Sequence, residues 1–209
     1  MIELFVSAFV TFFVVIDPPG CAPIFASLTA GTTAAHRRAM AVRAVMVAAA
    51  ILLVFALAGE PLLHGLGIEL ASFRIAGGIM LFLIALEMVF EKRTQRREDR
   101  AAKVTPDEAE DVSIFPMAMP MIAGPGSIAT VMLLVSRADG VERTFTVLMA
   151  LAANLALMLV ALLAAGPLMR ILGAKIEAVI TRLLGVLLAA LAVQFVIDGV
   201  QSQFGLAVS

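Results

Sequence analysis

The sequence predicts an all-α integral membrane protein, and three observations carry this prediction. The chain has 209 residues, of which 62% are hydrophobic, and its mean hydropathy is +1.05. A soluble domain is nearer half apolar, and one of this size must still present a large surface to water. The charged residues gather in short clusters between long uncharged stretches, as the loops of a membrane protein do. The net charge of −1 does not suggest a nucleic-acid partner, so we expect the lipid bilayer to be the main partner.

Six stretches are apolar enough to cross a membrane, since a spanning helix needs about 20 mostly apolar residues. They cover residues 2–29, 41–59, 73–90, 114–136, 144–166 and 180–198. We expect breaks in the first span at residues 17–20 and in the fourth around residues 116–126, because proline lacks an N–H and clashes with the preceding turn. Re-entrant hairpins over residues 1–31 and 114–136 are the alternative, since an unbroken helix over 2–29 is about 40 Å long and exceeds the ~30 Å hydrocarbon core.

The distribution of basic residues predicts the orientation, because Lys and Arg near span ends favour the cytoplasm. Twelve of the 15 Lys and Arg residues lie in the first, third and fifth loops. We therefore expect the N- and C-termini outside and these three loops inside. The third loop, residues 91–113, has mixed charge and few apolar residues, which predicts a solvated cytoplasmic linker.

The linker divides the chain into two three-span halves, residues 1–90 and 114–200. An odd number of spans makes the second half enter the membrane from the opposite side. Several residues recur at a spacing of 106 or 107, which predicts an inverted-topology repeat. The matches are Pro19-Gly20 with Pro125-Gly126, Gly78 with Gly185, Ala85 with Ala192, and Glu87 with Gln194.

The two predicted breaks form the candidate binding site. Unwound backbone inside a membrane survives only where protein buries it or where it lines a polar cavity, and paired broken helices are typical of transporter sites. Helices that restart at Gly20 and Gly126 would aim free N–H groups at an anionic group such as a carboxylate. The candidate residues are Asp17, Pro18, Pro19, Gly20, Gly124, Pro125, Gly126, Ser127 and Thr130.

Asp17 is the strongest single candidate, because a carboxylate within a span costs free energy and therefore suggests a functional role. It could pair with a substrate ammonium or bind a coupling proton or Na⁺, or it could only cap the helix that follows. Glu87 and Gln194 either line the cavity or reach the interface. Asn154 either lines the cavity or hydrogen-bonds a neighbouring helix.

Other functions lack the residues they need. Cys21 is the sole cysteine, so neither an intramolecular disulfide nor a thiolate metal cluster can form, and we expect no metal or cofactor. His36 and His64 fall in predicted loops on opposite sides, so a serine nucleophile at Ser127 has no base. The chain has no His-Glu-x-x-His motif either, and we expect no enzyme.

Three parts of the sequence carry a family resemblance: Phe-Val-Val-Ile-Asp-Pro-Pro-Gly (13–20), Phe-Pro-Met-Ala-Met-Pro-Met-Ile-Ala-Gly-Pro-Gly-Ser-Ile (115–128), and the strings Ile-Thr-Arg-Leu-Leu-Gly and Gln-Phe-Val-Ile-Asp-Gly within 180–199. In these strings the sequence resembles the MarC family of bacterial inner-membrane proteins, also described as a neutral amino-acid transporter family. It implies a six-span carrier in the inner membrane.

Together, the residues and the resemblance predict a secondary transporter of small neutral amino acids such as glycine or alanine, coupled to H⁺ or Na⁺. An exporter of another small solute or drug, or a non-transporting membrane protein, is the alternative. A homodimer is a possible assembly.

Overall fold

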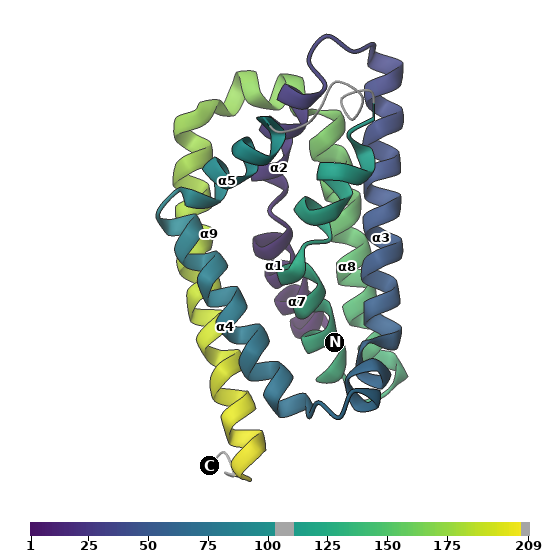
Figure 1. Cartoon of the computed structure of the whole chain (residues 1–209), viewed down its shortest axis with the longest axis vertical. Coiled ribbons are helices and arrows are strands. Elements are labelled where there is room, and N and C mark those ends of the chain that lie inside the picture. Colours follow the sequence, from purple (N-terminus) through teal and green to yellow (C-terminus); the bar gives the residue numbers. More distant parts are fainter. Residues whose placement is uncertain (103–110, 206–209) are drawn as a thin grey trace.

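The regular elements of the computed structural model are helices throughout the part of the chain that it describes (Figure 1). It describes residues 1–102 and 111–205, apart from the side chains of Thr94, residues 100–102 and residues 167–177. The elements are α1 (Ile2–Ile16), α2 (Pro18–Leu28), α3 (Ala34–Gly65), α4 (Leu70–Val89), α5 (Lys92–Ala102), the irregular helical segment η1 (Ser113–Ile122), α7 (Pro125–Ser136), α8 (Val141–Leu163) and α9 (Ala165–Phe204).

The predicted class, an all-α membrane protein with several spans, is confirmed. Five candidate spans are long and apolar enough to cross a membrane: Ile2–Leu28, Ala34–Gly65, Leu70–Val89, Val141–Leu163 and Ala178–Phe204. The first of these contains both α1 and α2. A sixth is present if η1 and α7, which meet at an angle of 52°, form one span.

The structure differs from the expected loops in three places. Helix α3 begins at Ala34, seven residues before the predicted span, because the Thr33 hydroxyl accepts a hydrogen bond from the His36 N–H at 3.3 Å and caps it. Helix α9 begins at Ala165, so the predicted fifth loop is helical; the side chains of Arg170 and Lys175 lie outside the described residues. Residues 92–102 of the expected linker form α5, whereas residues 103–110 lie outside the described part.

The helices pack in a pattern that relates the two halves of the chain. Helix α1 packs against α8, and η1 and α7 pack against α3, so the first unit of each half contacts the middle helix of the other. The third helices of the two halves, α4 and α9, run side by side along much of their length (Figure 1). The start of α1 and the end of α9 both lie in the lower half of this view.

Two glycines at matching positions set the α4–α9 separation. A Cβ atom built on Gly78 would lie 2.8 Å from the Ala192 carbonyl oxygen, and one on Gly185 would lie 3.1 Å from the Ala85 carbonyl oxygen. Gly78 of α4 thus faces Ala192 of α9, and Gly185 of α9 faces Ala85 of α4. The two glycines are 107 residues apart in the sequence, and so are the two alanines. Small residues allow backbones to approach this closely in a membrane.

Substitution of Gly78 by alanine is expected to lower the free energy of unfolding by about 1–3 kcal/mol, because the methyl group overpacks the α4–α9 contact. It would meet both the Ala192 carbonyl and, at 2.7 Å, Val196 Cγ2. Thermal unfolding of the purified protein in detergent measures the effect. Gly65→Ala is the matched control, since no atom lies within 4 Å of its built Cβ. Equal melting temperatures for the two variants would contradict the prediction.

Candidate functional site

The chain leaves the helical conformation at Asp17, between α1 and α2. Asp17 has φ 59° and ψ 65°, in the left-handed region. Pro18 and Pro19 follow in the first turn of α2, where a missing N–H costs nothing. One Asp17 carboxylate oxygen, Oδ1, accepts the Gly20 N–H at 3.2 Å and caps α2.

The two prolines leave carbonyls at the end of α1 without their helical donors. The carbonyl of Val15 would ordinarily accept the N–H of residue 19, which is a proline. A guanidinium nitrogen of Arg93, on α5, donates to this carbonyl at 2.6 Å instead. Arg93 therefore replaces a hydrogen bond that the sequence of α2 removes.

The second Asp17 oxygen, Oδ2, forms an ion pair with Arg97 at 2.8 Å. The side chain of Asp17 is 1% exposed and that of Arg97 is 6% exposed, so the pair is buried. Gly20 leaves the room for it, because a Cβ atom there would collide with the Asp17 carboxylate and lie 2.7 Å from the Arg97 guanidinium. The carboxylate expected inside the first apolar stretch thus has a buried arginine as its counter-ion.

The fourth apolar stretch is interrupted by its own prolines. Phe115 and Met119 are extended, with φ near −125° and ψ near 126°. Each precedes a proline, and proline disfavours the helical conformation of the residue before it. Gly124 is then the N-cap of α7 and Pro125 its first residue.

The start of α7 lies against the end of α1. A Cβ atom on Gly126 would lie 3.6 Å from Val15 Cγ1, an ordinary contact, and 2.5 Å from Ile84 Cδ1 of α4, whose flexible end would have to shift. The first intrahelical hydrogen bond of α7 runs from the Ile128 N–H to the Gly124 carbonyl. The N–H groups of Gly126 and Ser127 precede it, and such first-turn donors have no helical acceptor.

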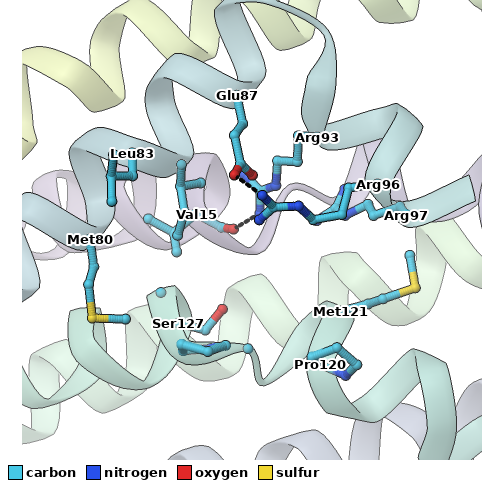
Figure 2. A pocket seen from close by; sticks show the side chains of 14 residues that line it. Val15, Met80, Leu83, Glu87, Arg93, Arg96, Arg97, Pro120, Met121 and Ser127 are labelled. Atoms are coloured by element: carbon cyan, nitrogen blue, oxygen red, sulfur yellow. Dashed lines mark hydrogen bonds and ion pairs between the residues drawn. The ribbon is translucent and has the colours of Figure 1, made fainter. Parts of the chain in front are cut away.

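A pocket of about 370 Å³ lies between α1, α4, α5, η1 and α7. This volume is within the ~300–1,000 Å³ typical of small-molecule sites. Figure 2 shows the polar groups that line it: Ser127 at the start of α7, Glu87 on α4, and the arginines of α5. Apolar side chains such as Met80, Leu83 and Ile84 form the rest of the wall. The pocket can therefore hold a small solute with at least one anionic group.

Among the described residues, two of the three arginines that line the pocket form an ion pair with a carboxylate. Arg96 forms an ion pair with Glu87 at 2.6 Å, and Arg97 pairs with Asp17. Burial and then the neighbouring Arg97 guanidinium lower the pKa of Arg93 to about 10. Arg93 is still a cation at neutral pH, because its pKa lies about three units above it.

The structure brings some of the sequence candidates together and separates others. Gly124, Pro125, Gly126, Ser127 and Glu87 line the pocket. Asp17, Pro18, Pro19 and Gly20 do not line it, but Asp17 pairs with Arg97, which does. The Thr130 hydroxyl donates to the Gly126 carbonyl at 2.8 Å within α7.

Asn154 and Gln194 lie elsewhere. The Asn154 amide donates to the Phe9 carbonyl at 2.9 Å and joins α8 to α1, which is the neighbouring-helix role considered above. Gln194 donates to Asp198 at 2.7 Å, and Asp198 also pairs with Arg137 of α7. Neither side chain lines the 370 Å³ pocket between α5 and α7, which we call the α5–α7 pocket.

Sequence reasoning missed the arginines of α5, because it assigned residues 91–113 to a solvated linker. Arg97 is 5% exposed as a whole residue, whereas most of the described side chains of α5 are exposed, so Arg97 departs from the expected solvated linker. The available signal was the spacing of Arg93, Arg96 and Arg97, since residues three and four apart lie on one face of a helix.

The fold and the pocket define a multi-span α-helical membrane protein with a charged pocket between its helices. The chain belongs to the MarC family of integral membrane proteins, whose model matches residues 2–204. It is 36% identical over 203 residues to the UPF0056 membrane protein MJ1677 of Methanocaldococcus jannaschii, covering 96% of this chain and 97% of that protein. It is 35% identical to the UPF0056 membrane protein YvbG of Bacillus subtilis (98% and 97% covered) and 34% identical to the UPF0056 inner membrane protein YhgN of Escherichia coli (94% and 95%). No solved structure matches the chain.

Substitution of Arg97 by glutamine is expected to destabilise the protein by about 3 kcal/mol, because it leaves the Asp17 carboxylate buried without its counter-ion. Thermal unfolding in detergent measures this. Arg96→Gln is the control from the same helix, and its cost is expected to stay below about 1 kcal/mol since the Arg96 side chain is 58% exposed. The double variant Asp17→Asn/Arg97→Gln should recover most of the loss. A melting temperature for Arg97→Gln equal to that of Arg96→Gln would show that the buried pair does not stabilise the fold.

Proposed function

We propose that the protein is a secondary transporter of small neutral amino acids, coupled to H⁺ or Na⁺, and that the α5–α7 pocket holds the cargo. The observation that carries the proposal is the start of α7. There Gly126 and Ser127, whose first-turn N–H groups have no helical acceptor, line a pocket between the helices of a multi-span membrane protein. Such donors, at the positive end of the helix dipole, favour a carboxylate.

The opposite wall supports a zwitterionic cargo. Glu87 lines the same pocket and can accept an ammonium group when it exchanges its contact with Arg96, which is largely exposed. Asp17 does not line the pocket but contacts it through its ion pair with Arg97. A proton or Na⁺ that binds its carboxylate competes with Arg97 and thereby links ion binding to the position of α5.

We propose further that the two halves, residues 1–90 and 114–200, are inverted repeats, with α1–α2 and η1–α7 as the corresponding broken spans. The reciprocal contacts of Gly78 with Ala192 and of Gly185 with Ala85 support this relation. The concentration of Lys and Arg in the first, third and fifth loops supports a cytoplasmic position for α5 and N- and C-termini on the outer side of the membrane. The similarity to YhgN, an inner membrane protein of Escherichia coli, supports an inner-membrane location.

Purified protein in proteoliposomes is expected to accumulate radiolabelled glycine or alanine when an H⁺ or Na⁺ gradient is imposed. Ser127→Ala should raise the half-saturating concentration about tenfold, since a hydrogen bond to a charged group contributes roughly 1.5–3 kcal/mol and tenfold corresponds to 1.4 kcal/mol. Ser136→Ala, at the far end of α7, is the matched control. Absence of gradient-driven glycine or alanine flux in either direction would refute the proposed substrate class.

Asp17→Asn is expected to abolish gradient-driven accumulation, because the amide can neither release a proton nor neutralise a cation. The double variant Asp17→Asn/Arg97→Gln separates this role from a structural one. It removes both charges and restores folding, yet it should still fail to accumulate amino acids against a gradient. Wild-type accumulation by the double variant would mean that Asp17 serves the structure alone.

A further inference from the structure

Arg93 differs from the other two arginines of the α5–α7 pocket. Arg96 and Arg97 each pair with a carboxylate, Glu87 and Asp17. Among the residues that the structure describes, Arg93 forms no ion pair. Its guanidinium donates to two neutral acceptors, the Val15 carbonyl at 2.6 Å and the Met88 sulfur at 2.9 Å. A guanidinium has five N–H donors, so donors remain for a further acceptor.

Ser127 supplies a second unused donor on the facing wall. It is 3% exposed and lines the pocket, and within residues 1–102 and 111–205 its hydroxyl has no hydrogen-bond partner. Figure 2 shows its hydroxyl pointing into the space between α7 and the side chains of α4 and α5. The Ser127 hydroxyl, the first-turn N–H groups of α7 and the Arg93 guanidinium are thus donors from facing walls of one pocket, and the acceptor atoms of an anion can bind them together.

The net charge of the site decides between classes of cargo. Among the residues that the structure describes, Glu87 and Asp17 pair with two of the three arginines at the pocket, so one positive charge is left when the pocket is empty, and Arg93 carries it. A zwitterion adds no net charge and leaves this positive charge uncompensated. A monocarboxylate neutralises it and can bind Arg93 in the paired geometry that guanidinium and carboxylate favour.

We infer that the α5–α7 pocket binds small monocarboxylate anions through Arg93 and the start of α7, in addition to zwitterionic amino acids. The inference rests on the proposed function, because it takes this pocket as the cargo site. It assigns to α5 a binding residue that neither three-span half contributes. The pKa of about 10 keeps Arg93 charged at the pH of the experiment.

Glycine and glycolate test the inference, since glycolate has a hydroxyl in place of the glycine ammonium and otherwise the same size. The assay measures the affinity of each for the full-length protein by thermal shift, followed by uptake into proteoliposomes. The wild type is expected to bind glycolate at least as tightly as glycine. Arg93→Gln should weaken glycolate binding at least tenfold and glycine binding by less. Lys92→Gln removes the same charge from an exposed position on α5 outside the pocket and should change neither.

Each outcome decides one of the two claims. If the wild type binds glycine and not glycolate, the inference fails and the proposed function stands. If neither ligand binds, the proposed function fails together with the inference. Unchanged glycolate binding in Arg93→Gln would overturn the role of Arg93. Should that variant fail to fold, Arg93→Lys keeps the charge and loses the paired geometry, and an unchanged glycolate affinity in it would overturn the same role.

Discussion

The buried ion pair between Asp17 and Arg97 is the constraint on which the rest of the site depends. A carboxylate between two helices of a membrane protein requires a counter-ion, and a lone buried charge is far more costly than a paired one. Asp17 and Arg97 lie 80 residues apart, so the pair fixes α5 against the junction of α1 and α2. Once α5 is held there, Arg93 reaches the Val15 carbonyl and the pocket gains its basic wall.

Proline chemistry explains why this junction needs α5. Pro18 and Pro19 allow α2 to begin sharply, but they also remove the N–H donors that the last carbonyls of α1 require. In water such carbonyls would be solvated, whereas in a membrane the protein must satisfy them. Arg93 does so for Val15. The charged helix therefore completes the hydrogen bonding of an apolar one, which ties the local break to a distant segment of the chain.

The parts of the fold that were predictable are those that neighbouring residues determine. The apolar stretches follow from composition, and the departures from helix at residues 17, 115 and 119 follow from the prolines beside them. The burial of Arg97 was not predictable in this way. Residues 91–113 have the composition of a solvated loop, and contacts with Asp17 and Val15 draw Arg97 and Arg93 inward, whereas Arg96 stays largely exposed beside Glu87. Asp17 was recognised as a costly carboxylate, but its partner lay in the segment least resembling a membrane helix.

The strength of the contacts also divides the molecule into parts that can move and parts that cannot. Gly78 and Gly185 bring α4 and α9 so close together that a Cβ atom on either glycine would nearly touch a carbonyl oxygen of the other helix. Such close packing leaves no room for the two helices to slide without a loss of contacts. Helix α5 is held by the ion pair of Arg96 with Glu87, which is partly exposed to solvent, and by the buried pair of Arg97 with Asp17; Glu91, just before α5, forms a further exposed pair with Arg182. Exposed pairs contribute little and exchange readily with water, so the buried Asp17–Arg97 pair is the main barrier to the displacement of α5. A ligand or ion that competed for either member of that pair would weaken this barrier.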